Sequence, residues 1–156
     1  MIVVSDTTPL NYLIRLGLIG LLEEFYGAVY IPTAVLAELQ HARTPDSVRS
    51  WAQNPPAWLV IRTVSSELPE LADLDLGERK ALSLAVQLQA GLLLADDLEA
   101  RQAASRLGLA LTGTLGVIRD ATEAGRLNFD ETIADLQQLG FRVSPTAIES
   151  ARPQKR

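Results

Sequence analysis

Short apolar runs alternate with longer amphipathic stretches along most of the chain. The apolar runs are rich in leucine, valine and isoleucine, which predicts buried strands over residues 2–4, 28–31, 59–61, 92–95 and 110–112. Elsewhere apolar residues recur three or four positions apart, which predicts helices over residues 9–16, 18–25, 32–42, 45–53, 77–89, 99–107, 115–123 and 130–139. We place the cap of the first helix at Thr8, and residues 141–143 resemble an edge strand.

This alternation favours strands joined by helical crossovers, and therefore an α/β fold with a mostly parallel sheet covered by helices on both faces. The chain shows no internal repeat and no low-complexity segment. We expect one domain over residues 1–143, followed by a C-terminal extension over residues 144–156 that is frayed at its end.

Composition narrows the chemistry that the chain can perform. Its 156 residues are 47% hydrophobic, which excludes a disordered chain, and its net charge of -5 argues against coating nucleic acid by bulk charge. The chain has no cysteine and a single histidine, His41, so any catalysis must use carboxylates, hydroxyls, arginines or a metal. No apolar segment is long enough to span a bilayer, and we expect a cytoplasmic protein without membrane association.

Acidic residues follow two of the predicted strands directly. Asp6 follows the first strand, and the Asp96–Asp97 pair follows the most apolar one. If both strands are central and parallel, these carboxylates meet at the sheet edge where ligands bind in such folds. Helix capping is the competing interpretation, because Asp96 and Glu99 have the spacing of a capping box.

Two further acids lie on apolar helix faces. Glu78 precedes Ala81, Leu82 and Ala85 by three, four and seven positions, and therefore lies on the stripe that faces the sheet. Glu38 has a similar place in the helix over residues 32–42. A capping role beside Asp75 is the alternative for Glu78, and a solvated flank is the alternative for Glu38.

Together these acids would converge on one sheet edge without enough nearby bases to pair them. Like charges in such an arrangement raise one another's pKa or hold a divalent cation. Ligation by oxygen alone favours Mg²⁺ or Mn²⁺. The pattern therefore indicates a metal site.

The order and spacing of these motifs resemble the PIN-domain family. The matching segments are VSDTTPL at 4–10, PxxVxxE at 32–38, LGExxA at 76–81, LLADDxxxR at 93–101 and GTLGV at 113–117. The last segment is similar to a bacterial and archaeal branch often found beside small antitoxin-like genes. The resemblance covers residues 2–143 and implies a three-layer α/β/α sandwich. It also implies an Mg²⁺- or Mn²⁺-dependent endoribonuclease, frequently a homodimeric toxin silenced by a partner protein.

Carried over by position, the resemblance implies catalytic roles for Asp6, Glu38, Glu78 and Asp96. It implies one or two metal ions held by Asp6, Glu78 and Asp96 or Asp97. The candidates for contacts with the RNA substrate are Ser5, Thr7, Arg101 and Thr114.

Two other functions fit parts of the pattern. One is a non-catalytic PIN-like module that binds RNA or a protein partner, although such a module has no reason to keep the repulsive acids. The other is an α/β phosphatase or phosphotransferase with an aspartate after its first strand. That class usually has a second acid two positions later, where this chain has Thr8.

Overall fold

A five-stranded parallel sheet forms the centre of the computed structural model, which describes residues 1–154. Its strands lie in the order β3-β2-β1-β4-β5, and each described strand pair is parallel. Their bounds are Val3–Ser5 for β1, Val29–Pro32 for β2, Leu59–Arg62 for β3, Leu92–Leu94 for β4 and Leu111–Thr112 for β5. The α/β class with a parallel sheet is therefore confirmed.

Helices connect these strands and continue beyond the last one. They are α1 (Thr7–Arg15), α2 (Gly20–Tyr26), α3 (Thr33–Leu39), α4 (Asp46–Gln53), α5 (Leu76–Gln87), α6 (Leu98–Arg106), α7 (Thr114–Glu123), α8 (Phe129–Gln138) and α9 (Pro145–Ala151), with a 3₁₀ turn at Pro69–Leu71. None of the helices within residues 1–154 has both the length and the apolar character needed to cross a bilayer.

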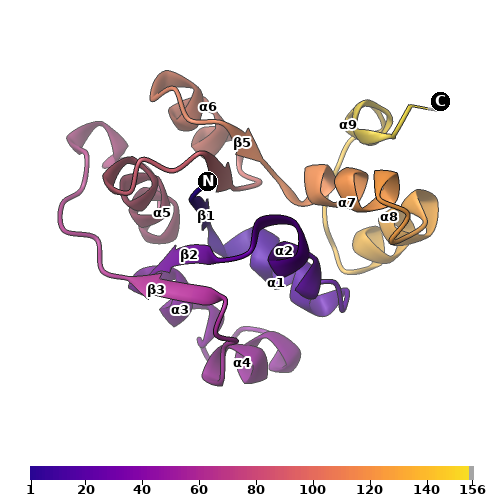
Figure 1. Cartoon of the computed structure of the whole chain (residues 1–156), viewed down its shortest axis with the longest axis horizontal. Coiled ribbons are helices and arrows are strands. Elements are labelled where there is room, and N and C mark those ends of the chain that lie inside the picture. The colour runs from indigo at the N-terminus through magenta and orange to yellow at the C-terminus, as the bar shows by residue number, and fades with distance from the viewer. Residues whose placement is uncertain (155–156) are drawn as a thin grey trace.

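Alternation along the strands divides the core into two layers. Val3 and Leu94 face one apolar cluster, together with α1, α2, α3 and α4, whereas Val4 and Leu93 face the other, together with α5 and α6. This division follows from the two-residue period of a strand, which sends neighbouring side chains to opposite faces. The result is the expected three-layer α/β/α sandwich (Figure 1).

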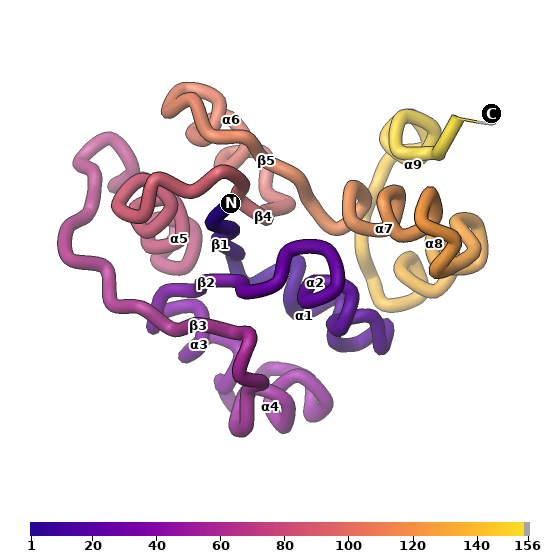
Figure 2. Tube along the Cα trace, viewed as in Figure 1, coloured from indigo at the N-terminus to yellow at the C-terminus, as the bar shows by residue number. Residues whose placement is uncertain are grey.

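The C-terminal helices form a third cluster beside the sandwich. After β5 the chain passes through α7 and α8 and returns to α9, as the trace in Figure 2 shows. Ile118, Phe129, Leu136 and Ala151 are buried where these three helices meet. Each helix covers an apolar face of the others, so the cluster has a small core of its own.

Two local predictions were wrong, and one helix was missed. Residues 141–143 form no strand within the described chain, because Gly140 turns the chain at φ 94° and Phe141 packs edge-on against Tyr12. Helix α9 was not predicted from the sequence. Helix α1 begins at Thr7 rather than after Thr8, with Asp6 at the N-cap position.

The order of the strands reverses between β1 and β4. From β1 the chain proceeds outward through β2 and β3, and it then returns to build β4 and β5 on the other side. Helices α1 and α6 leave β1 and β4 toward opposite faces of the sheet. Open α/β sheets bind ligands in the crevice at such a reversal, at the carboxyl ends of the strands.

Candidate metal centre

Asp6 lies at the carboxyl end of β1, at this reversal. Its backbone N–H donates to the Leu94 carbonyl at 2.8 Å, which ties the residue to β4. The side chain makes no capping hydrogen bond to α1 and is only 5% exposed. Burial, together with the charges of Glu38, Asp75 and Asp96, raises the pKa of Asp6 to about 7 despite the lowering effect of the Thr7 N–H. Asp6 is thus a buried carboxylate without a neutralising partner.

Asp96 lies at the end of β4 and is held by the start of α7. Both of its carboxylate oxygens accept hydrogen bonds from Thr114, one from the backbone N–H and one from Oγ1, each at 2.7 Å. Gly113 precedes this helix without a capping side chain, and a Cβ there would collide with the Asp96 carboxylate. Burial raises the pKa of Asp96, although Thr114 and Arg101 act against that shift. Asp96 therefore caps a helix distant in sequence.

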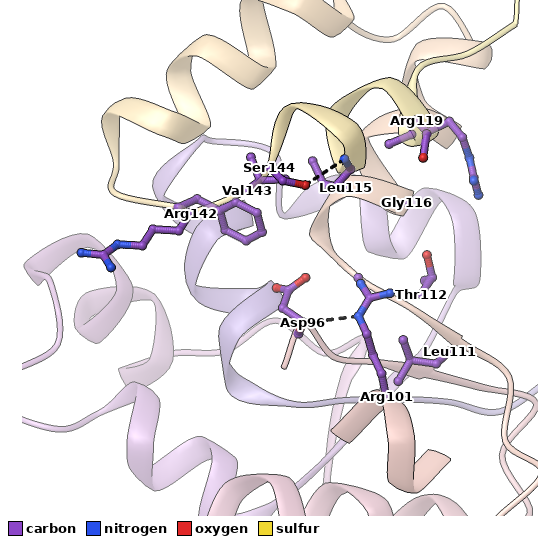
Figure 3. Close-up of a pocket in the computed structure, with 15 residues that line it drawn as sticks. Asp96, Arg101, Leu111, Thr112, Leu115, Gly116, Arg119, Arg142, Val143 and Ser144 are labelled. Carbon is purple, nitrogen blue, oxygen red and sulfur yellow. Dashed lines mark hydrogen bonds between the residues drawn. The ribbon is translucent and has the colours of Figure 1, made fainter. Parts of the chain in front are cut away.

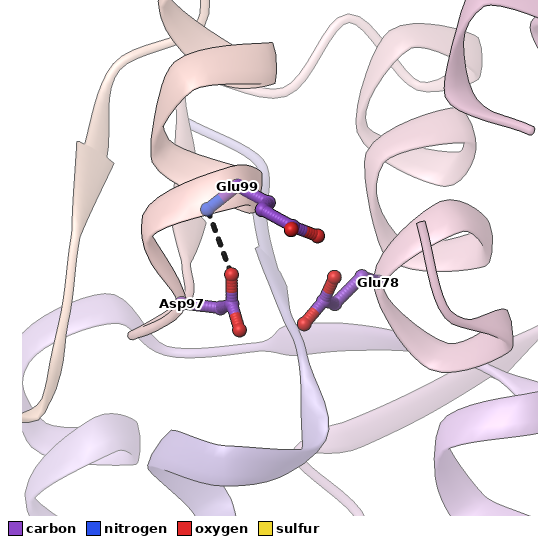
Figure 4. Close-up of side chains that lie close together, drawn as sticks. All are labelled: Glu78, Asp97 and Glu99. Carbon is purple, nitrogen blue, oxygen red and sulfur yellow. Dashed lines mark hydrogen bonds between the residues drawn. The ribbon is translucent and has the colours of Figure 1, made fainter. Parts of the chain in front are cut away.

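Asp97 faces a different pair of acids. One carboxylate oxygen from each of Glu78, Asp97 and Glu99 lies within 4.8 Å of the others, as Figure 4 shows. Asp97 also caps α6, because its Oδ1 accepts the Glu99 N–H at 2.7 Å. The capping interpretation placed that cap at Asp96, which was wrong by one residue. Asp96 and Asp97 thus direct their carboxylates to different neighbours, Asp96 to Thr114 and Asp97 to Glu78 and Glu99.

Glu78 is buried in the first turn of α5. Burial and the charges of Asp75, Asp97 and Asp6 together raise the pKa of Glu78 to about 8. The Glu78 N–H donates to Asp75 Oδ1 at 3.0 Å, so the capping interpretation for Asp75 holds. The cap positions Glu78 without neutralising its carboxylate. Both interpretations of Glu78 therefore hold: its N–H takes part in the helix cap with Asp75, and its carboxylate lies near the charges of other acids.

Glu38 reaches the crevice from α3. Its Oε2 accepts a hydrogen bond from Thr7 Oγ1 at 2.6 Å, and its charge contributes to the raised pKa of Asp6. The carboxylate also lies against Gly77 so closely that a Cβ at position 77 would collide with it. A side chain at position 77 would therefore displace the Glu38 carboxylate from its present place.

The two other hydroxyl candidates are fully buried. Ser5 Oγ donates to the Asp6 carbonyl at 2.9 Å, and Thr114 Oγ1 is occupied by Asp96. Arg101 is exposed and lies beside Asp96, where its Nε donates to the Asp96 carbonyl at 3.5 Å. The hydroxyls therefore contact the acids and their backbone, whereas Arg101 faces solvent.

Two acids of this site were not among the candidates from the sequence. Asp75 and Glu99 were considered only as capping residues, yet Asp75 raises the pKa of both Asp6 and Glu78, and Glu99 lies in the group around Asp97. Their spacing signalled helix starts, which are common surface features. Only the approach of α5 to α6 shows that these two starts face each other.

The residues present fit a divalent cation of the Mg²⁺ or Mn²⁺ type. The donors are carboxylate oxygens, the ligands that these hard cations prefer. Asp6 and Glu78 are buried near other carboxylates, and this burial and repulsion keep their pKa values high. A bound divalent cation would offset the repulsion between these carboxylates.

Comparisons with known proteins agree with this fold. A family model described as a PIN domain matches residues 2–155. The chain belongs to the PIN-domain family. A similar solved structure is that of a PilT N-terminus domain protein, SSO1118, from the hyperthermophilic archaeon Sulfolobus solfataricus P2. It is 18% identical with a TM-score of 0.54 over 75% of this chain and 90% of that one, a likeness in fold. No curated protein sequence matches the chain.

Membership of the family sets the general chemistry. PIN domains are generally metal-dependent nucleases, and the acidic crevice of this PIN domain offers the oxygen ligands that such an activity needs. The phosphatase or phosphotransferase alternative is therefore set aside.

Proposed function

We propose that this PIN domain is an Mg²⁺- or Mn²⁺-dependent endoribonuclease that hydrolyses single-stranded or structured RNA. The observation that carries the proposal is the position of Asp6. It is a carboxylate at the topological reversal of the sheet, and its burial, with the charges of Glu38, Asp75 and Asp96, keeps its pKa high. An uncompensated carboxylate in that place is costly unless the site binds a cation.

In this proposal Asp6, Glu78 and Asp96 or Asp97 would hold one or two ions, and Glu38 would either ligate an ion directly or position a water molecule. Glu99 joins the part of the site that Glu78 and Asp97 form. The bound metal would lower the pKa of a water molecule and neutralise charge on the scissile phosphate.

The remaining candidates hold these groups in place or bind the substrate. Thr114 fixes both oxygens of Asp96, and Thr7 fixes one oxygen of Glu38. Ser5 is buried under Asp6 and stabilises the turn after β1. Arg101 is exposed beside Asp96, where its guanidinium is suited to a substrate phosphate.

Cleavage of a labelled, mixed-sequence RNA tests the proposal. We expect cleavage with Mn²⁺ or Mg²⁺ and none with EDTA. Asp6→Asn should lower the rate more than about 100-fold, since loss of even an outer partner of a metal ligand costs 10–100-fold. Asp135→Asn, which removes an exposed acid on α8, is the matched control and should cleave at the wild-type rate.

Two results would contradict the mechanism: equal cleavage in EDTA, or equal cleavage by Asp6→Asn. An RNA that binds tightly and stays intact with either metal would instead favour the non-catalytic binding module.

We also propose that the protein acts in the cytoplasm as a homodimeric toxin with a small antitoxin protein. The resemblance to the antitoxin-associated branch suggests this setting. Leu76 and Leu98 add an observation, because they are 49% and 67% exposed and directly follow Asp75 and Asp97. Apolar side chains beside the acids suit a protein that covers them.

Co-expression with the product of an adjacent small gene should inhibit cleavage, and light scattering should give twice the monomer mass. If the protein is a monomer, and if the product of the adjacent gene leaves its cleavage unchanged, the proposal of a homodimeric toxin with an antitoxin is contradicted.

A further inference from the structure

A pocket opens directly beside the acidic crevice. Its volume is about 540 Å³, and Asp96 forms part of its wall, so the pocket and the metal centre share a residue. The other walls come from α6 and β5, from the start of α7, and from residues 141–151 of the C-terminal segment. Figure 3 shows this arrangement, with the C-terminal segment closing the pocket opposite Arg101.

The charge of the pocket is opposite to that of the chain. Arg101, Arg119 and Arg142 line it, against the single acid Asp96, whereas the whole chain has a net charge of -5. In Figure 3 the Arg101 side chain rises between Asp96 and Thr112, and Arg119 and Arg142 lie on opposite sides of it. In this view the guanidiniums of Arg119 and Arg142 point away from Arg101, on either side of the pocket, where they suit phosphates of a strand that crosses it.

These arginines are available to a ligand. Within residues 1–154 neither Arg101 nor Arg142 forms an ion pair, and Arg119 contacts only its neighbour Asp120, at 3.3 Å. By contrast, Arg79, the other arginine close to the acids in sequence, is engaged by Glu67 at 2.9 Å. The pocket therefore concentrates positive charge that is only partly engaged, since Arg101 acts on Asp96 without an ion pair and Arg119 pairs with Asp120 alone.

The walls between the arginines are mixed in character. Leu111, Leu115, Phe141 and Val143 provide apolar surface, and the hydroxyl-bearing residues Thr112, Ser144 and Ser150 also line the pocket. The volume lies in the range of sites for small organic ligands. Apolar surface flanked by guanidiniums and hydroxyls is complementary to a nucleotide, which joins a flat base to a ribose and a phosphate.

We propose that this pocket binds the nucleotide adjacent to the scissile phosphate of the RNA. Arg101 binds the phosphate nearest to Asp96, and Arg119 and Arg142 bind the phosphates on either side. The C-terminal segment thus contributes to substrate binding. The inference rests on the proposed ribonuclease function, because it treats Asp96 as the boundary between the pocket and the cleavage site.

Binding measured without cleavage separates this inference from the activity. In the Asp6→Asn background with Mg²⁺, the affinity for a fluorescent 12-nucleotide RNA is measured by anisotropy at several salt concentrations. Arg101→Gln and Arg142→Gln should each weaken binding by about fivefold to tenfold and lower the slope of log affinity against log salt by about one. Arg106→Gln removes the same charge from α6 outside the pocket and should stay within about twofold.

The outcomes distinguish the two proposals. If wild-type protein cleaves RNA but Arg101→Gln and Arg142→Gln bind it as Arg106→Gln does, the pocket inference fails and the ribonuclease stands. If the wild type cleaves nothing while both pocket variants bind weakly, the ribonuclease fails and the pocket still binds RNA.

A competition arm tests the main rival ligand, an acidic peptide. If oligoglutamate displaces the RNA only at a far higher concentration than unlabelled RNA does, and displaces it equally from the wild-type and Arg106→Gln proteins, the result supports a nucleotide as the ligand. Oligoglutamate that binds more tightly than the RNA, and loses affinity in the pocket variants, overturns the inference. Circular dichroism melts of each variant ensure that the comparison is made between folded proteins, and Arg142 is exposed enough to be replaced without loss of fold.

Discussion

At the scale of single residues, Asp6 shows most clearly the conflict between stability and the proposed metal binding. Its carboxylate is buried among other acids, so the folded protein favours the protonated form, whereas metal binding needs the ionised form. A residue chosen for stability in this place would be neutral. The conflict gives a measurable dependence of stability on pH.

The metal-free protein should become less stable as the pH rises from about 4 to about 8. In this range the folded protein keeps protons on Asp6, with a pKa of about 7, and on Glu78, with a pKa of about 8, that the unfolded chain has released near their ordinary values of 3.8 and 4.5. The state that binds more protons loses stability as protons are removed. Thermal unfolding in EDTA at pH 5 and pH 8 measures the effect.

Asp6→Asn should reverse part of this loss. At pH 8 in EDTA the variant should be more stable than wild type by about 2 kcal/mol, because it removes a buried charge. Excess Mn²⁺ should stabilise wild type by about 2.7 kcal/mol at 100 times its dissociation constant, and the variant much less. Asp135→Asn should follow wild type in both buffers. Equal melting temperatures for wild type and Asp6→Asn in every buffer would show that the carboxylate bears no such cost.

At the scale of secondary-structure elements, two helix starts depend on glycines beside the acids. Gly113 lets Asp96 approach α7 and serve as its cap, and Gly77 lets α5 pass close to Glu38 on α3. Both contacts join elements that are distant in sequence. The position of each acid is therefore a property of two elements together.

Gly77→Ala should lower activity while preserving the fold. Alanine favours a helix by about 0.5–1 kcal/mol over glycine, but its Cβ would displace the Glu38 carboxylate. We expect kcat/KM to fall about tenfold, and the free energy of unfolding to change by less than about 1 kcal/mol. Gly20→Ala, at the first position of α2 with open space around it, is the matched control and should leave kcat/KM unchanged. A Gly77→Ala variant with wild-type kcat/KM would exclude a dependence on the position of Glu38.

At the scale of the whole molecule, the C-terminal helix packs outside the two clusters that flank the sheet. Ala151 and Ile148 on α9 pack against α7 and α8, whereas the two clusters around the sheet contain no residue of α9. We therefore propose residues 1–143 as the folding unit and residues 144–156 as an extension of it.

A chain ending at Val143 should fold and yet bind RNA weakly. Loss of the buried Ala151 and part-buried Ile148 should cost about 2 kcal/mol, at about 25 cal/mol per Å² of apolar surface. The pocket should also lose the wall formed by Ser144, Ala147 and Ser150. Circular dichroism melts and RNA anisotropy measure both effects. If the shortened chain fails to unfold cooperatively, residues 144–156 belong to the folding unit itself.

The sequence by itself determined the layers and the strand-end acids. Strand and helix periods are local, and apolar runs such as residues 92–95 have only one stable place, in a sheet buried on both faces. Parallel strands then carry Asp6, Asp96 and Asp97 to one edge, whatever the details of packing. For the same reason, local alternation misled at residues 141–143, where a glycine turn and the contact of Phe141 with Tyr12 decide the conformation.

Only the tertiary structure decided how the acids divide and what surrounds them. Thr114 holds Asp96, Asp97 faces Glu78 and Glu99, and Asp75 acts on both parts of the crevice. It also assembled the arginine pocket from α6, α7 and the C-terminal segment. Contacts of this kind depend on how helices cross, and electrostatic effects depend on burial and distance in space. Neither quantity is encoded in the spacing of residues along the chain.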